Sequence, residues 1–578
     1  MSAPPGRAPT PPPPGREAWL TDEVRPARGG SRRGSSPGRR PAFLRDWRAV
    51  SGIVLLVVAV VIALLVLRGG SDGGPLAGRA ADLVPADTLA YLDVSTDGDR
   101  SATTKALTLL RRLGAEQTVT DQLDALLGGD AAAQPVAFSR DVRPWLGDEA
   151  ALALTRGVGT TAGSLLLLSV ADEDGAREFL ARTSGHATTA AYHGTPVSAF
   201  DSGAVTAFVD GFLVIGQQRS VRAAIDLAAG SGGGRGRAGS RSLAADPTYR
   251  RASAGEPADR ALDAYASVDG VRRLLAPQSG LLGLAGALLD QRGLLAAGMS
   301  VSARGDTASV HVRQVLDPRQ HNASSTFTPT LTRLVPRSAL AYAGFAGLQR
   351  ALPLLLGVSG ISGLTGVGGA GGLGADTATL IRQAGRLLAD QGVSFARDIL
   401  PLLGGEVAVA LVQVDRAPGV VLLASVPDEG QARTALRGLE PAIARLFAPA
   451  SGPAPSFTDV RAGAAAARQL KASGGVELDY AVGRGVLAVS TSADALSAVL
   501  AGSGSIADSP AFKTVISDPA AKATSIVFFD FSQLLSLFEP KGSTDSGLAT
   551  ELRRIRTAGF TSTSGESQTT AELTFEIP

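Results

Sequence analysis

The hydrophobic and polar positions divide the chain into one long apolar run near its start and many shorter segments after it. The run, AVSGIVLLVVAVVIALLVL at residues 49–67, has 19 residues and no charge. As a helix it would be roughly 28 Å long, close to the ~30 Å hydrocarbon thickness of a bilayer. The pattern therefore predicts a single transmembrane helix over residues 49–67.

Arginine is concentrated on the N-terminal side of this helix. Residues 1–48 contain ten Arg and four acids, whereas the linker at residues 68–81 opens with one Arg followed by GGSDGG. The positive-inside rule then places the N-terminus in the cytosol and the rest of the chain outside. A cleaved signal peptide is the competing interpretation, but its apolar core is normally 7–15 residues long behind a short basic lead. We expect a single-pass signal anchor.

Residues 1–48 are rich in Pro, Arg and Ser, including PTPPPPGR at 9–16. Such a composition buries too little apolar surface to offset chain entropy, which predicts a disordered cytosolic tail. Its prolines could dock in an aromatic groove, or its arginines could contact anionic lipid. The chain uses 50 Arg against 5 Lys and one Asn, which is typical of a GC-rich bacterial genome. We therefore expect the protein to be anchored in the cell membrane of a bacterium.

Beyond residue 81 the same pattern occurs twice. LVPADTLAYLDV at 83–94 is echoed by LVPRSALAYAGF at 334–345. FSRDVRPWLGDEAALAL at 138–154 shares ten of its seventeen residues with FARDILPLLGGEVAVAL at 395–411. Three further pairs keep the same order, with offsets between 251 and 263 residues. A constant order with a slowly drifting offset predicts an internal duplication.

Within each copy, short apolar runs alternate with segments of helical spacing. LAYLDV, EAALAL and SLLLLSV predict strands, and Asp172 and Asp428 occupy N-cap positions of the helices that follow. GFLVIG and GVLAVS predict strands before a second helix, and SVSARGDTASVHVRQV at 300–315 predicts a closing hairpin. Tight turns between consecutive strands favour antiparallel pairing, with the helices packed on one face of the sheet.

The predicted fold class is therefore α+β, with one N-terminal transmembrane helix and two tandem copies of an antiparallel-sheet-plus-helices unit. The domains expected are the tail at 1–48, the transmembrane helix at 49–67, a linker at 68–81, copy one at 82–317, a linker at 318–332 and copy two at 333–578.

Three of these segments resemble a known family. The LVPADTLAYLDV opening, the RPWLGDEAALAL block and the PTYRR…YASVDG segment are similar to the bacterial "domain of unknown function 3352" proteins. The resemblance covers most of residues 82–578. Copy two departs from it, with Leu402 in place of Trp145 and Gly405 in place of Asp148. The resemblance implies a membrane-anchored exported protein of undetermined activity and supplies no active-site residues.

Composition and charge limit the chemistry further. The chain has no Cys, which excludes disulfides, thiol nucleophiles, iron–sulfur clusters and thiolate zinc sites. The net charge is +2, of which residues 1–48 carry +6, so the remainder is acidic and we expect no nucleic-acid binding. The histidines form no i, i+3 or i, i+4 pair, which argues against a metal site. They are His186, His193, His311 and His321.

Two glycine patterns match functional motifs without the required context. Gly69–Gly73 fits GxSxG, but a nucleophile elbow needs a strand before it and a helix after it. Gly366–Gly371 fits GxGxxG inside a run in which any glycine pattern would match. We predict no catalytic, cofactor-binding or metal-binding residues and no cofactor.

The acids that recur in both copies are the best remaining functional candidates. A bend at Pro144 and Gly147 could bring Asp141 and Glu149 together as an acid/base pair. A structural role is the better account, because folding requires these acids in both copies whereas catalysis requires only one intact site. The recurring pairs are Asp141 with Asp398 and Glu149 with Glu406.

Residues 351–375 form an uncharged, Gly-dense run. Gly disfavours a second spanning helix, so this run is either a loop packed on the domain or an apolar flap over a lipid-binding cavity or at the membrane surface.

The sequence favours a non-catalytic envelope protein that binds a lipid or another hydrophobic ligand, which predicts a sizeable apolar cavity. A module that binds another envelope protein is the alternative, and it predicts filled cores and an exposed patch that differs between the copies. The third hypothesis is a carboxylate-dependent hydrolase, which predicts that Asp141 and Glu149 converge in a polar cleft.

Overall fold

The structure is a computed structural model, and it describes only part of the chain. Residues 1–77 lie outside the described residues, and so do the predicted tail, the transmembrane helix at 49–67 and the apolar run at 351–375. No helix within the described residues is long and apolar enough to cross a membrane. The described ranges are 78–97, 100–112, 138–156, 163–183, 186–201, 203–231, 241–275, 292–320, 325–346, 393–394, 405–414, 417–449, 452–473, 475–502, 504–518, 521–538 and 553–578.

The described residues between 78 and 320, here called the first half, form ten strands and several helices. The strands are β1 (Ala90–Ser95), β2 (Leu146–Thr155), β3 (Gly163–Val170), β4 (Ala187–Tyr192), β5 (Thr195–Phe200), β6 (Val205–Val209), β7 (Phe212–Gly216), β8 (Arg260–Ser267), β9 (Leu294–Arg304) and β10 (Thr307–Leu316). The helical segments are η2 (Arg79–Asp82), α2 (Ser101–Arg112), η3 (Phe138–Val142), α4 (Glu173–Thr183), α5 (Gln218–Ser231), α6 (Pro247–Ala252), α7 (Val268–Gly270) and η4 (Val271–Leu275).

The described residues between 325 and 578, the second half, also form ten strands. They are β11 (Ala339–Ala346), β12 (Glu406–Val414), β13 (Ala417–Ser425), β14 (Phe457–Ala462), β15 (Ala465–Lys471), β16 (Glu477–Gly483), β17 (Val486–Ser490), β18 (Ser525–Asp530), β19 (Thr557–Ser564) and β20 (Gln568–Glu576). The helical segments are η5 (Leu331–Arg333), α11 (Glu429–Leu446), α12 (Ala493–Ala501), η9 (Ile506–Asp508), α13 (Pro510–Val515) and α14 (Phe531–Phe538).

All twenty described strands belong to one antiparallel sheet, which confirms the α+β class and the antiparallel pairing. The strands of each half pair in the same order, so that each strand of the first half has a counterpart numbered ten higher. The order is β4-β5-β6-β7-β3-β2-β1-β8-β9-β10 in the first half, continuing as β20-β19-β18-β11-β12-β13-β17-β16-β15-β14 in the second.

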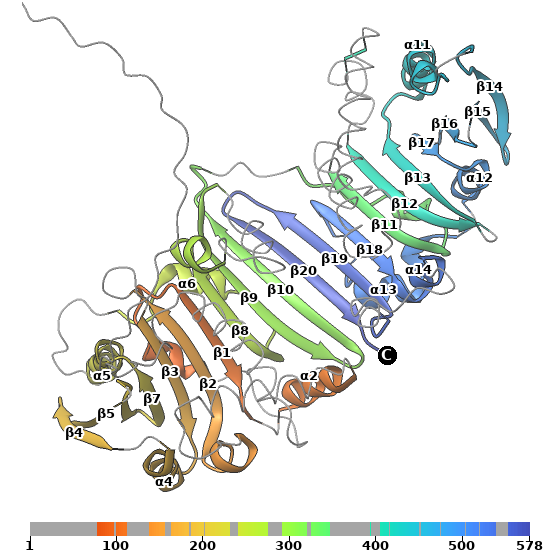
Figure 1. The fold of residues 1–578 in the computed structure, drawn as a ribbon. Coiled ribbons are helices and arrows are strands. Elements are labelled where there is room, and N and C mark those ends of the chain that lie inside the picture. The colour runs from red at the N-terminus through yellow and green to blue at the C-terminus, as the bar shows by residue number, and fades with distance from the viewer. Residues whose placement is uncertain are drawn as a thin grey trace, which may run out of the picture. The chain divides into compact units, whose positions relative to one another are not determined.

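The two halves join where β10 pairs with β20, a junction here called the seam. The pairing runs antiparallel from Thr307 opposite Glu576 to Val315 opposite Gln568. Figure 1 shows the two strands as neighbours within the sheet. The last strand of each half therefore pairs with the last strand of the other half. The strand order is the same when it is read outward from the seam in either direction.

Helices cover both faces of the sheet, so the expectation of helices on one face was wrong. On the face that carries Tyr91, the helix α5 contributes Val221 and Ala224 to the core. On the opposite face, which carries Leu92, Ala106 of α2 packs against the sheet. The strands read as nearly continuous apolar runs because both of their faces are buried.

In each half, one glycine in the sheet lets a helix approach the sheet closely. A Cβ on Gly298 of β9 would lie 2.3 Å from the carbonyl oxygen of Ala252, the last residue of α6. A Cβ on Gly559 of β19 would lie 2.3 Å from the carbonyl oxygen of Val515, the last residue of α13. Neither position tolerates a side chain without a shift of the backbone.

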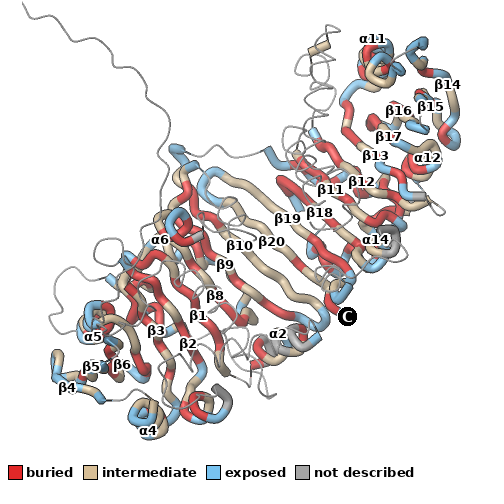
Figure 2. The backbone as a smooth tube through the Cα atoms, in the orientation of Figure 1, coloured by how far each residue is buried: buried red, intermediate tan, exposed pale blue. Residues whose placement is uncertain are grey.

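The seam strands are less buried than the strands on either side of them. Residues 307–313 of β10 and most of β20 are half-buried, whereas β1 is almost entirely buried. Figure 2 shows the same contrast along the sheet. The face between α6 and α13 is therefore open to solvent at the seam.

Candidate functional site

Glu149, one of the acids singled out by the sequence, holds the N-terminal end of η2. Its side chain is fully buried, and its two oxygens accept hydrogen bonds from the backbone N–H groups of Arg79 (3.1 Å) and Ala80 (2.8 Å). Its own N–H donates to Oγ of Ser169 at 2.8 Å. Burial raises the pKa of Glu149, while the two N–H groups act against this effect. The carboxylate thus satisfies helix-end donors that have no partner within η2.

Glu406 has the same role in the second half. It accepts hydrogen bonds from the N–H and the hydroxyl of Thr330 at 2.8 and 2.6 Å, and from the N–H of Leu331 at 3.2 Å. Its own N–H donates to Oγ of Ser425 at 3.0 Å. These contacts support the structural account of the recurring acids.

Asp141 lies in a different environment from Glu149. Its carboxylate binds Arg140 at 2.8 Å and lies 3.6 Å from Arg182, and its carbonyl oxygen accepts a hydrogen bond from the indole of Trp145. The partners of Asp141 and Glu149 are different groups, so the structure does not pair these two acids as an acid/base couple. Asp398 lies outside the described residues.

Two further acids, which sequence reasoning missed, lie in the core of the first half. Asp93 of β1 and Asp263 of β8 are directly opposite each other and are 2% and 8% exposed. Burial raises the pKa of Asp93 well above its usual range, and the nearby Glu149 and Asp263 add to the effect. Burial also raises the pKa of Asp263 to about 6, although Arg260 binds this carboxylate at 2.6 Å. An Asp within an otherwise apolar strand was the available sequence signal.

These acids begin a row of polar residues that extends over six strands and crosses the seam. Each member is directly opposite the next in the sheet, where side chains on one face are about 5 Å apart. The row consists of Asp93, Asp263, Ser300, His311, Glu572 and Thr561. It ends at Ile526, which is opposite Thr561 on β18.

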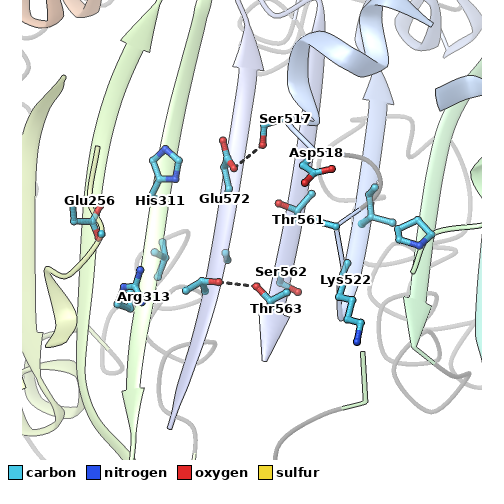
Figure 3. A pocket seen from close by; sticks show the side chains of 18 residues that line it. Glu256, His311, Arg313, Ser517, Asp518, Lys522, Thr561, Ser562, Thr563 and Glu572 are labelled. Carbon is cyan, nitrogen blue, oxygen red and sulfur yellow. Dashed lines mark hydrogen bonds between the residues drawn. The ribbon is translucent and has the colours of Figure 1, made fainter. Parts of the chain in front are cut away.

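A polar groove lies over the part of this row that crosses the seam. It has a volume of about 230 Å³, and Figure 3 shows its side chains on the strands of both halves. The loop after α6 forms one wall and the loop after α13 forms the other. Its lining comprises Gly255, Glu256, His311, Val312, Arg313, Pro329, Ser517, Asp518, Ala521, Lys522, Ala523, Ile526, Thr561, Ser562, Thr563, Thr570, Ala571 and Glu572.

Hydrogen bonds position several charged groups of the groove. Ser300 donates to Glu256, and Ser517 donates to Glu572 at 3.1 Å. Arg313 uses one nitrogen to donate to Gln568 at 2.8 Å. Neither Arg313 nor Lys522 has an ion-pair partner among the described residues. The groove therefore offers cationic groups that a ligand could neutralise.

Glu256 also connects the groove with the buried acids. It lines a second, very small cavity of about 10 Å³, together with Asp263 and three tyrosines, Tyr91, Tyr249 and Tyr265. The ring of Tyr249 makes edge contacts with the other two rings. This cavity is close to the smallest volume that holds one water molecule.

The described histidines do not form a metal site with nearby acids. Nε2 of His193 lies 3.4 Å from Asp226, and His311 lines the groove, whereas His321 lies outside the described residues. No cluster of three or more His, Asp or Glu in the described part of the chain could hold a metal ion.

Comparison with known sequences identifies a family. The sequence model of a family described as "protein of unknown function (DUF3352)" matches residues 49–354. The chain belongs to this family. The match to DUF3352 confirms the resemblance carried by the LVPADTLAYLDV and RPWLGDEAALAL segments. No curated protein matches the chain.

Solved structures of the protein TP0453 share limited similarity with this DUF3352 chain. Crystal forms I and IV are 11% and 12% identical to it, cover 42% of this chain and 80% of their own, and have a TM-score of 0.25. Crystal form III is 11% identical, with coverages of 44% and 89% and a TM-score of 0.26. These TM-scores are too low for any conclusion about the fold or the function of this chain.

Proposed function

We propose that the chain is a membrane-anchored, non-catalytic binding protein of the bacterial cell envelope that holds a small polar ligand in the seam groove. The observation that carries this proposal is the position of the groove. Its floor comes from β10, β19 and β20, so both halves contribute to it, and its cationic side chains have no ion-pair partner within the described part of the chain. A concave site with a few converging polar groups is the usual form of a small-molecule site.

The anchor is proposed from the sequence alone. The uncharged run at 49–67 has the length of a membrane span, and the arginines before it favour a cytosolic N-terminus. The lack of Cys allows a direct test with single-cysteine variants of the full chain. A membrane-impermeant maleimide should label Ser567→Cys in intact cells, and should label Ser36→Cys only after lysis. The reverse pattern would invert the topology.

We also propose that the two halves are tandem copies of one unit, at residues 82–317 and 333–578, joined by a linker at 318–332. The common strand order and the counterpart contacts of Glu149 and Glu406 support this proposal. The short segments before each copy belong with it, since Ala80 and Thr330 donate hydrogen bonds to these carboxylates.

A binding role fits the acids better than a hydrolytic one. Both recurring glutamates are engaged by backbone N–H groups, and removing either carboxylate would leave buried donors without partners. A general acid or base must instead be free to exchange a proton with substrate.

Native mass spectrometry of the full chain, extracted from its own membrane in mild detergent, tests this function. We expect a small polar molecule to co-purify or to bind from a polar cell extract. The double substitution Arg313→Ala with Lys522→Ala should abolish its binding, and Arg461→Ala, an exposed arginine on β14, should not. Equal binding by all three proteins would place the ligand elsewhere, and no bound polar molecule in any sample would overturn the proposal.

A lipid or another hydrophobic ligand is the second candidate. Its support is the uncharged run at 351–375, and its prediction of an apolar cavity concerns residues outside the described part. The same spectra discriminate the two candidates, because a lipid would be released by organic extraction and would survive the Arg313→Ala and Lys522→Ala substitutions. Co-purification of an envelope protein in place of a small molecule would favour the interaction-module alternative.

A further inference from the structure

We infer that the groove binds a small zwitterion with an ammonium group and a carboxylate, of the size of an amino acid or dipeptide. This inference rests on the proposed function and adds the chemical class of the ligand. It is carried by the arrangement of opposite charges within the groove.

The acidic side chains gather along one side of the groove. Glu572 extends from β20 beside His311 of β10, while Glu256 and Asp518 come from the two walls. Figure 3 shows these four side chains from left to right, in the order Glu256, His311, Glu572 and Asp518. A carboxylate accepts several hydrogen bonds, so Glu572 retains acceptor capacity beyond its bond from Ser517. This side of the groove is suited to an ammonium group.

The cationic side chains lie along the other side. Arg313 is two residues beyond His311 on β10, and Lys522 comes from the wall that precedes β18. Figure 3 places them at the two ends of a row that contains Thr563. Thr563 and Thr570 share a hydrogen bond of 2.7 Å between the two cations. Arginine and lysine donors flanking hydroxyl groups are suited to a carboxylate.

The spacing between the two sides matches a small zwitterion. Two residues along an antiparallel strand span about 6.8 Å, which separates the level of His311 and Glu572 from that of Arg313 and Thr570. Side chains that reach inward from both levels can contact charges only a few ångströms apart. A simple anion or cation would interact with the charges of one side only, whereas a zwitterion interacts with both.

Volume and composition narrow the class further. The groove, at about 230 Å³, is smaller than the 300–1,000 Å³ typical of sites for drug-sized ligands. His311 carries the only aromatic ring among the described residues that line the groove, which include no Phe, Tyr or Trp. Nucleobases bind mainly by stacking on aromatic side chains, so a nucleotide fits poorly.

The test uses the full chain in detergent and isothermal titration calorimetry at low salt. A thermal-shift screen of the common amino acids and of simple dipeptides first selects the best zwitterion. Its N-acetyl and C-amide derivatives, each of which lacks one charge, are then titrated. We expect each derivative to bind at least tenfold more weakly. Glu572→Gln should weaken binding of the parent compound and of the C-amide, and Arg313→Gln should weaken binding of the parent and of the N-acetyl compound.

The matched control is Arg461→Gln, which should bind all ligands as the unmodified chain does. A derivative that binds as tightly as the parent would overturn the zwitterion inference, and so would a screen without any binder. Neither result contradicts the proposed function, which the native mass spectra test. A co-purifying polar molecule of another class would still support the groove as a binding site. The two failures are therefore distinguishable.

Discussion

The two halves of the sheet use one strand order and fill one equivalent position in opposite ways. In the first half, Asp93 of β1 is directly opposite Asp263 of β8. In the second half the corresponding strands, β11 and β18, place Gly344 opposite Ile526. A Cβ on Gly344 would lie 2.7 Å from the hydroxyl of Tyr342 and 3.1 Å from a methyl carbon of Ile526, so these two side chains occupy the space that the glycine leaves. A pair of acids in one half thus corresponds to an apolar pair in the other.

This difference distinguishes features that the fold requires in both halves from features that occur in one half only. Glu149 and Glu406 keep the same contacts with a preceding helical segment, as a folding requirement predicts. Asp93 and Asp263 have no acidic counterpart, and burying a carboxyl group destabilises a fold unless it is protonated or paired. At this position, next to the groove that Glu256 lines, the first half therefore tolerates the cost of buried carboxyl groups, and the second half does not bear it.

The largest expected effect tests what the halves share. Glu149→Ala and Glu406→Ala should each lower local stability by about 4 kcal/mol, because each leaves buried N–H donors without a partner. Hydrogen–deuterium exchange measured by mass spectrometry should show faster exchange in η2 and β2 for the first variant, and in η5 and β12 for the second.

Asp148→Ala is the control for this comparison. Asp148 pairs with Arg79 at 2.6 Å, but both side chains are about half exposed, so its loss should cost less than about 1 kcal/mol. A large effect of Glu149→Ala beside a neutral Glu406→Ala would show that the two positions are not equivalent.

The second prediction concerns the difference between the halves. Because the pKa of Asp263 is raised from 3.8 to about 6, the folded state binds this proton more tightly than the unfolded state does. Its contribution to stability is complete below about pH 3.8 and is lost as the pH rises through 6, by at most about 3 kcal/mol. Asp263→Asn should remove this loss, so the variant should gain stability relative to the unmodified chain between pH 4 and pH 7.

Urea unfolding followed by tryptophan fluorescence measures this effect in the first half alone. Trp145 is buried there, and the other two Trp, Trp19 and Trp47, precede the predicted transmembrane helix. The charged groups around Asp263 include Arg260, Glu256 and Arg100 as well as Asp93, so the difference between variant and parent is the quantity to compare. An unchanged difference from pH 4 to pH 7 would mean that Asp263 has an ordinary pKa.

The sequence predicted the apolar strands better than it predicted the exposed β4–β5 hairpin and the placement of the helices. The apolar runs gave β1, β2, β3 and their counterparts, and the Asp172 and Asp428 caps gave α4 and α11. The hairpin β4–β5 was missed, because ATTAAY is small, polar and mostly exposed and so lacks an alternating hydrophobic pattern. The helices on the second face were missed although runs such as EAALAL are apolar on both sides, a pattern that indicates burial on both faces.

The candidate site depends on contacts that the sequence does not encode locally. The repeated sequence pattern alone identified Glu149 and Glu406, but their partners lie about 70 residues earlier in the chain. The seam joins His311 to Glu572, which are 261 residues apart and are brought together only by the pairing of β10 with β20. No local pattern predicts such a pair, since its formation depends on tertiary structure.

The third prediction tests whether the halves pack their helices alike. Gly298→Ala and Gly559→Ala should each lower stability by about 2 kcal/mol, because the new Cβ would lie 2.3 Å from a backbone oxygen of α6 or α13. Local hydrogen exchange in these two helices measures the effect. Gly230→Ala is the control, since its Cβ meets nothing within 4 Å and alanine favours the helix α5 by about 1 kcal/mol. Unequal losses would show that the two helices approach the sheet differently.

The smallest expected effect concerns the helix caps. Asp172 accepts a hydrogen bond from the N–H of Gly175 at 3.2 Å, and Asp428 accepts one from Gln431 at 2.9 Å. Replacing either aspartate with Ala should destabilise its helix by about 1 kcal/mol, measured as faster exchange in the first turn of α4 or α11. Asp174→Ala, also in the first turn of α4, should change exchange by only a few tenths of a kcal/mol. A greater loss of helix stability for Asp428→Ala than for Asp172→Ala would agree with the shorter hydrogen bond of Asp428. It would show that two caps with the same role can differ in strength.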